Sequence, residues 1–202
     1  MSAATAGTLL ALLGSLVAAP AAFGQDPRLR DRLDPETAGR VDQVVDSARK
    51  LGLPTEPLIQ KALEGHSKGA PNARIVTAVG ALLDALAGAR ASLGARSSEE
   101  ELVAGALWIR AGGAAGDLAA FRRSAPTRPL AVPIAVSTEL LSRGYARAGA
   151  VESASALLSA GISDAEFVAL KRRVDEAVRG GTRFDAAVRT EVIKAQAGRK
   201  QP

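Results

Sequence analysis

Apolar stripes at helical spacing, separated by glycine and proline, dominate residues 34–197. The clearest stripe consists of Ile75, Val79, Leu82 and Leu86, whose steps of four, three and four residues follow one face of an α-helix. The glycines and prolines between stripes are residues that end one helix and begin the next. No two alternating runs are joined by a hairpin turn pair. The sequence therefore predicts an all-α fold of about seven to nine short helices packed as antiparallel helical hairpins.

Two segments carry the signature of a capping box, Ser98 with Glu101 and Ser163 with Glu166. In this motif the serine hydroxyl accepts a hydrogen bond from an early amide of the helix, and the acidic side chain accepts one from the amide of the serine. Each pair therefore predicts the first turn of a helix.

Residues 130–136 are the one stretch that alternates like a strand. Pro133 lies inside it, and a proline would remove a hydrogen bond from a strand ladder. The apolar residue Leu140 and the stop at Gly144 continue a helical pattern instead. We therefore predict a helix that begins near Pro129 or Pro133.

A glycine followed six residues later by an apolar residue recurs four times along the chain. The pairs are Gly52 and Leu58, Gly69 and Ile75, Gly112 and Leu118, and Gly161 and Phe167. One explanation is a shared capping pattern, in which a left-handed glycine ends a helix and a cap opens the next. The other is an αα-solenoid with units of roughly 40 to 47 residues, as in HEAT-like repeats. We prefer the first and keep the second open.

The N-terminal segment has the features of an export signal. Residues 1–24 contain no charged side chain, and the apolar run at residues 8–19 is too short for a stable membrane anchor. The small residues Ala22 and Gly24 favour cleavage just before Gln25. The alternative is an uncleaved anchor.

We divide the chain into a signal peptide (1–24), a polar linker (25–33), a single helical domain (34–197) and a disordered tail (198–202). The mature protein is expected to be periplasmic or extracellular, without a membrane span.

Composition excludes several chemistries. The chain contains no cysteine and a single histidine, His66, which removes thiolate nucleophiles, iron–sulfur clusters and cysteine-bound zinc. Only 3% of residues are aromatic, which argues against stacking on bases or sugars. The glycine-rich residues 112–116 lack the Lys-Ser/Thr end of a phosphate-binding loop. We expect no catalytic metal and no cofactor.

Residues 65–69 match the G-x-S-x-G pattern of a serine hydrolase, with Ser67 in the place of the nucleophile. A nucleophile elbow needs a strand before the serine, and its histidine base comes from later in the chain. Here a helix precedes Ser67, and the only histidine lies beside it. We therefore reject this match and assign no catalytic residue; Gly65 and Gly69 are interpreted as the exit from one helix into the next.

The formal net charge is +5, and the excess lies in residues 120–202, which contain fourteen basic and eight acidic residues. We select Arg122, Arg123 and Arg173 as possible contacts for an anion or a partner. The alternative is an ordinary solvated helix surface, which we prefer. An exported protein meets envelope proteins and acidic polymers, so we expect one of these as the partner and no nucleic acid.

Trp108 is the fourth candidate contact. On a helical wheel it lies away from the centre of the face formed by Leu102, Val103, Ala106 and Ile109. It either packs in a second layer, which is the commoner fate of a tryptophan and the one we favour, or marks an exposed site for a partner.

Residues 52–65, followed by Ser67-Lys68-Gly69, resemble a motif of uncharacterised exported helical proteins from bacteria with high-GC genomes. The resemblance covers residues 34–178. It implies a bacterial envelope setting and an all-helical fold, and it carries no activity, ligand or site residue. The expected function is a non-enzymatic interaction or structural module of the envelope. The alternative is a hydrolase of envelope polymers that uses two carboxylates.

Overall fold

The computed structural model of the chain describes residues 26–198. The predicted signal peptide and all but one residue of the predicted tail lie outside this range. The described part folds into ten α-helices without a strand, which confirms the all-α prediction and slightly exceeds the expected number. They are α1 (Pro27–Arg32), α2 (Pro35–Lys50), α3 (Glu56–Ser67), α4 (Asn72–Leu93), α5 (Glu99–Arg110), α6 (Ala115–Ser124), α7 (Ala131–Ser142), α8 (Arg147–Ser159), α9 (Asp164–Arg179) and α10 (Phe184–Ala197).

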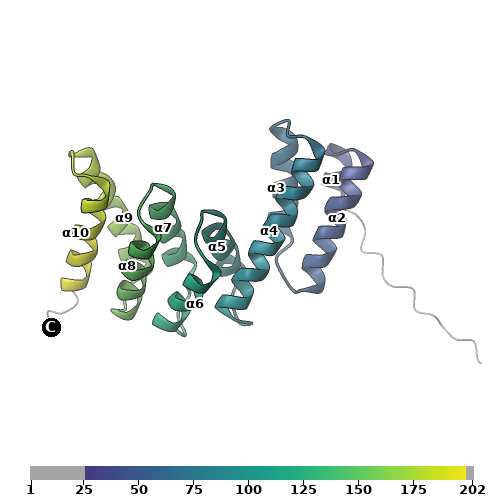
Figure 1. Cartoon of the computed structure of the whole chain (residues 1–202). Coiled ribbons are helices and arrows are strands. Elements are labelled where there is room, and N and C mark those ends of the chain that lie inside the picture. The colour runs from purple at the N-terminus through teal and green to yellow at the C-terminus, as the bar shows by residue number, and fades with distance from the viewer. Residues whose placement is uncertain (1–25, 199–202) are drawn as a thin grey trace, which may run out of the picture.

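The helices stand side by side in one elongated row from α1 to α10 (Figure 1). Consecutive helices alternate between two layers. In the second layer, each even-numbered helix packs against the next even-numbered one, from α2 to α10. In the first layer, α1 packs against α3, and α5, α7 and α9 form a continuous series. This is the stacking of an αα-solenoid. The first-layer helices α3, α5, α7 and α9 begin at residues 56, 99, 131 and 164, so only one of the three units between them has the expected 40 to 47 residues.

The recurring glycines have the backbone conformation that the capping explanation requires. Gly69 has a φ of +65°, and its three counterparts in the pattern also have positive φ. A residue with a Cβ is strained in this region, whereas glycine is not. The local capping pattern and the stacking of hairpins are therefore one arrangement, because each capped turn returns the chain antiparallel to the previous helix.

Local signals in the sequence set the ends of several helices as expected. Both predicted capping boxes are present, at the starts of α5 and α9. Residues 130–136 are helical rather than extended, since α7 begins at Ala131 and includes Pro133 in its first turn.

The prediction of a polar linker before residue 34 was wrong. Residues 27–32 form α1, which Asp26 caps by accepting a hydrogen bond from the amide of Arg28. Leu29 and Leu33 are buried, and their spacing of four residues places both on the face that contacts the core. Two leucines in an otherwise charged segment were too weak a signal to identify the helix.

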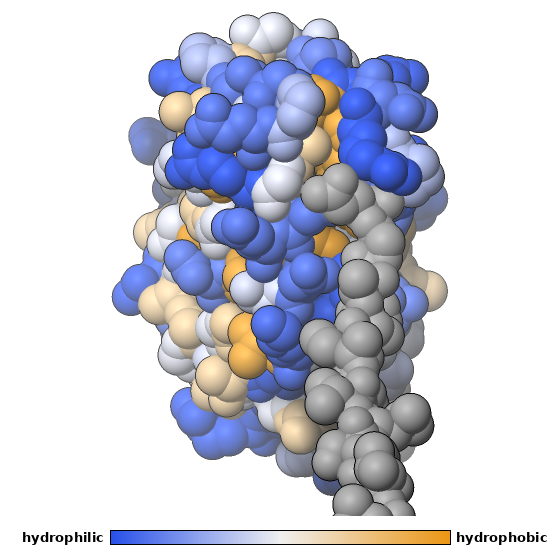
Figure 2. Space-filling view, turned by 90° about the vertical axis from the view of Figure 1, so that its right-hand side faces the viewer, coloured by the Kyte–Doolittle hydropathy of each residue, from blue (hydrophilic) through white to orange (hydrophobic). Residues whose placement is uncertain are grey.

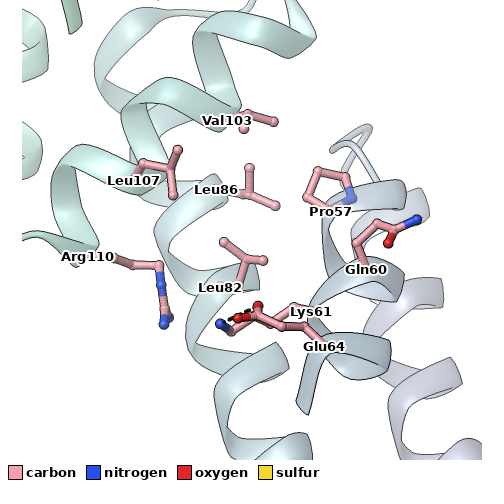
Figure 3. Close-up of a pocket in the computed structure, with 9 residues that line it drawn as sticks. All are labelled: Pro57, Gln60, Lys61, Glu64, Leu82, Leu86, Val103, Leu107 and Arg110. Atoms are coloured by element: carbon pink, nitrogen blue, oxygen red, sulfur yellow. Dashed lines mark hydrogen bonds and ion pairs between the residues drawn. The ribbon is translucent and has the colours of Figure 1, made fainter. Parts of the chain in front are cut away.

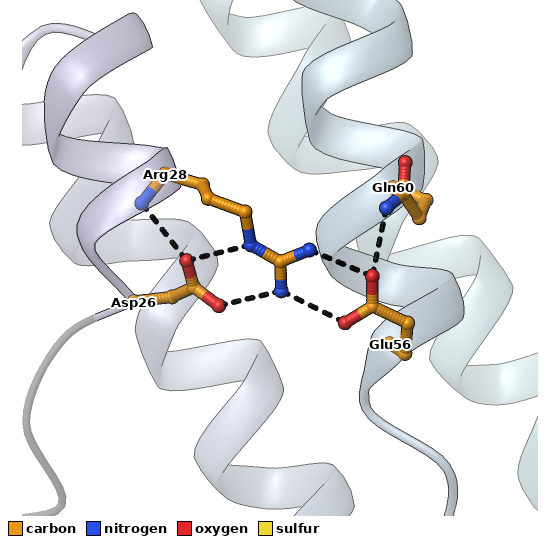
Figure 4. Close-up of polar contacts among 4 residues, drawn as sticks. All are labelled: Asp26, Arg28, Glu56 and Gln60. Atoms are coloured by element: carbon orange, nitrogen blue, oxygen red, sulfur yellow. Dashed lines mark hydrogen bonds and ion pairs between the residues drawn. The ribbon is translucent and has the colours of Figure 1, made fainter.

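An ion-pair network joins α1 to α3 (Figure 4). The guanidinium of Arg28 lies 2.8 Å from both Asp26 and Glu56, and Gln60 donates a further hydrogen bond of 2.7 Å to Glu56. Figure 2 views the stack from this end, where the surface outside the grey trace is largely hydrophilic. A polar outer face is what the terminal unit of a helical stack requires.

The core is mostly aliphatic, and the described residues contribute two aromatic pairs to it, Trp108 with Phe121 and Tyr145 with Phe184. Helix α4 lies at its centre and contacts α2, α3, α5 and α6. Among the helices of residues 26–198 it is also the one long and apolar enough to cross a membrane, by length and composition alone.

Candidate functional site

The first layer is interrupted between α3 and α5, and a groove occupies the interruption (Figure 3). Its floor is the face of α4 that carries Leu82 and Leu86, and its volume is about 400 Å³. The walls are supplied by Pro57, Gln60, Lys61 and Glu64 of α3 and by Val103, Leu107 and Arg110 of α5. Figure 3 shows that α3 and α5 run in the same direction, with Pro57 and Val103 near one end and Glu64 and Arg110 near the other.

Two glycines allow the wall helices α3 and α5 to pack closely on the floor helix α4. A Cβ added to Gly65 of α3 would lie 2.9 Å from Cγ1 of Ile75 in α4. A Cβ added to Gly105 of α5 would lie 2.9 Å from the Cβ of Ala89, also in α4. Without side chains at these positions, α3 and α5 each approach α4 closely. Both helices are therefore fixed to α4, while the space between them stays open.

The groove exposes apolar surface. The side chain of Leu107 is 52% exposed, although α5 lies in the middle of the stack, and Val103 one turn away is partly exposed. Leu82 and Leu86 below them are buried at the bottom of the groove. An apolar strip at the bottom of a groove with polar rims is typical of a site for another molecule.

The end of the groove nearest the C-termini of α3 and α5 is positively charged. Glu64 accepts hydrogen bonds from Lys61, at 2.9 Å, and from Lys68, and these two ammonium groups hold the pKa of Glu64 at about 2. Arg110, on the facing wall, has no ion-pair partner among residues 26–198. Two lysines therefore share one carboxylate at this end, and Arg110 adds a third cation, unpaired among the described residues.

The candidate residues from the sequence do not form this groove. Trp108 is fully buried, and its ring packs edge-on against that of Phe121 with the ring centroids 5.5 Å apart. Its indole N–H donates hydrogen bonds of 3.2 Å to the carbonyl of Ala114 and of 3.2 Å to the carboxylate of Asp117. This corresponds to the packing alternative. Burial removes Trp108 from the set of surface contacts.

The three candidate arginines differ in their contacts. Arg122 of α6 forms a 2.6 Å ion pair with the buried Glu101, and Arg173 of α9 forms a 2.8 Å ion pair with the buried Glu191. Arg123 is exposed, and within the described part of the chain it has no ion pair. Two of the three arginines thus neutralise buried carboxylates of neighbouring helices instead of facing an external anion.

The G-x-S-x-G segment lies at the end of α3. The hydroxyl of Ser67 donates a 2.9 Å hydrogen bond to the carbonyl of Glu64, in the preceding turn of the same helix. Gly69 follows in the left-handed conformation and turns the chain toward α4. The strand that would display a nucleophilic hydroxyl is replaced by a helix here.

Carboxylates in the described residues are not arranged as a catalytic pair in the groove. Glu64 is the one carboxylate that lines it, and Glu101 and Glu191 lie on separate helices, each bound to its own arginine. Within residues 26–198, no group of three or more His, Cys, Asp or Glu side chains could hold a metal ion.

The fold and the groove define a two-layer helical stack with one open position in its first layer. No family model, curated protein or solved structure matches the chain. Sequence reasoning missed the groove because it treated Val103 as part of the core face and gave Leu107 no role. The available signal was the pair of apolar residues at positions 103 and 107, which lie on one side of α5 beside the main stripe.

Proposed function

We propose that this protein is an exported, non-enzymatic interaction module of the bacterial envelope, and that the groove between α3 and α5 binds a partner protein. The observation that carries the proposal is the interrupted first layer, which leaves Leu107 half exposed above the apolar floor of α4. Elsewhere in both layers, successive helices of the described chain contact each other directly. A helical stack offers extended surfaces of this kind for binding.

The chemistry of the groove supports binding over hydrolysis. A glycosidase-type hydrolase needs two carboxyl groups facing the same bond, one of which is protonated at working pH. The pKa of Glu64 is held at about 2, so this carboxyl group is ionised at neutral pH and already bonded to two lysines. It is placed to fix the shape of the rim, not to donate a proton.

Site-specific photo-crosslinking tests the binding site. A photoreactive amino acid in place of Leu107 is expected to crosslink one partner protein in envelope fractions of the producing bacterium. The same amino acid in place of Leu51, which is 60% exposed at the end of α2, is the matched control. Equal products from both positions, or none from position 107, would refute the groove as the binding site.

Export is tested separately on the full-length chain. Cell fractionation is expected to place the protein outside the cytoplasm, and N-terminal sequencing is expected to begin at Gln25. A cytoplasmic protein that retains residues 1–24 would refute the envelope assignment.

A further inference from the structure

The geometry points to a particular occupant of the groove: an amphipathic helix of the partner that runs antiparallel to α3 and α5, with acidic residues in its first turn against Arg110. This inference rests on the proposed function, because it names the partner element that the groove binds. It follows from the backbone of the walls, from the apolar residues of α5 and from the distribution of charge along the groove.

The walls favour a helix over an extended segment. Both walls and the floor are α-helices, whose backbone N–H and C=O groups are bonded within each helix. An added strand would find no free backbone groups to pair with, whereas a helix satisfies its own. A helix also matches the local architecture, since a neighbouring helix occupies the equivalent position on the other side of α5. The occupant therefore contributes side chains to the groove, not backbone hydrogen bonds.

One side of α5 presents a complete stripe to this occupant. Glu99 and Glu100 form its first turn, Val103 and Leu107 follow at helical spacing, and Arg110 ends it. Residues three, four and seven apart lie on the same side of a helix. The stripe is thus acidic at its start, apolar in the middle and basic at its end. A complementary helix is apolar on the facing side and carries the opposite charges at its ends.

The two ends of the groove differ in charge. At the C-terminal end of the walls, Lys61, Lys68 and Arg110 outnumber the single carboxylate Glu64. At the N-terminal end, Glu99 and Glu100 are exposed, and neither is paired with a cation within residues 26–198. Acidic side chains of a partner therefore bind best beside Arg110.

The helix dipoles favour the same orientation. The C-termini of α3 and α5 carry partial negative charge, which attracts the partially positive N-terminus of a third helix. Acidic residues are also favoured in the first turn of any helix, where they face the dipole. An antiparallel occupant places this first turn beside Arg110 and so satisfies both interactions. A parallel occupant would oppose the dipoles of both walls, whereas an antiparallel occupant opposes only the dipole of α4, which runs opposite to the walls (Figure 3).

Crosslinking from two positions on α5 measures the direction and the secondary structure of the bound segment. Photoreactive amino acids are placed at positions 103 and 110 in separate variants, and the crosslinked residues of the partner are mapped by mass spectrometry. The two positions are seven residues apart on a helix, or about 10.5 Å. The residue crosslinked from position 110 is expected to precede the residue crosslinked from position 103 by about seven residues of a helix.

Each alternative outcome has its own meaning. An offset of about three residues would indicate an extended segment and would overturn the inference. The reverse order would indicate a parallel helix and would overturn it as well. In both cases the groove would still bind a partner, so the proposed function would stand. If the Leu107 position captured no partner, the proposed function and this inference would fail together.

A charge reversal tests the electrostatic part with a synthetic peptide of the mapped segment. Arg110→Glu is expected to weaken binding about threefold to tenfold, measured by fluorescence anisotropy, with the loss concentrated in the association rate. Arg123→Glu is the matched control, because Arg123 is also exposed but lies outside the groove. An equal loss in both variants, or none in Arg110→Glu, would refute the placement of the acidic turn.

Discussion

Glu101 joins three helices, and its replacement by alanine tests how the stack is held together. The carboxylate is 6% exposed and accepts hydrogen bonds from the amide of Ser98 at 3.0 Å, the amide of Leu130 at 2.8 Å and the guanidinium of Arg122 at 2.6 Å. These donors belong to the start of α5, the end of α6 and the start of α7. The substitution therefore removes a capping contact and leaves a mostly buried cation without its partner.

The expected loss is about 4 kcal/mol. Breaking a buried ion pair from one side costs about 3 to 5 kcal/mol. The side chain of Arg122 is 22% exposed and keeps a hydrogen bond to the carbonyl of Arg128, so the lower end applies. The unpaired amide of Leu130 adds about 1 kcal/mol. For a chain of this size each kcal/mol lowers the melting temperature by about 2 to 4 °C, which gives a decrease of about 8 to 16 °C.

Urea denaturation followed by circular dichroism at 222 nm measures this loss. Glu99→Ala is the control, because Glu99 is exposed in the same first turn of α5 and its loss is expected to cost less than about 1 kcal/mol. The double variant Glu101→Leu with Arg122→Leu should be more stable than the sum of the single changes predicts, since it leaves no unpaired charge. A loss below about 1 kcal/mol for Glu101→Ala would refute the reasoning.

Two further predictions concern packing and pH. Gly113→Ala should destabilise the protein by about 1 to 3 kcal/mol, because its Cβ would lie 2.1 Å from Nε1 of Trp108, and the change should alter tryptophan fluorescence. Gly116→Ala, where nothing lies within 4 Å, should leave that fluorescence unchanged, and similar effects of both substitutions would contradict the assignment. The carboxyl group of Glu56 should have a pKa of about 2 when measured by NMR, because Arg28 and Gln60 stabilise its ionised form. The substitution Arg28→Ala should raise this pKa toward 4.5. Since the pKa is lowered in the folded state, the stabilisation from this pair is complete above about pH 4.5 and disappears as the pH falls toward 2. A pKa near 4.5 in the unaltered protein would contradict the network of Figure 4.

Much of the fold follows from signals that act within a few residues. The boxes at Ser98 and Ser163, the left-handed Gly69 and the apolar stripe of α4 were all present as predicted. Each depends on one turn of backbone or on one face of one helix. The error at α1 has the same origin, because Leu29 and Leu33 show their role only when another helix covers them.

The surroundings of the candidate contact residues could not be predicted in the same way, because they depend on residues far apart in the chain. Arg122 has no acidic residue three or four positions away, and Arg173 has Glu176 three positions away. Each is instead paired with a glutamate on another helix, 21 and 18 residues away. Trp108 lies away from the main stripe of α5 but is covered by α6. Local spacing cannot reveal these partners, since stacking of the hairpins brings them together.

The sequence by itself determined the helical secondary structure, the turns between helices and the absence of cysteine chemistry, because these depend on short-range backbone preferences and on composition. Only the tertiary structure decided that α3 and α5 stay apart above Leu82 and Leu86. Gly65 and Gly105 each let a wall approach α4 more closely than a side chain would permit, so both walls pack on α4. Distances between helices depend on such contacts across the core, so the groove could be recognised only after the helices were packed.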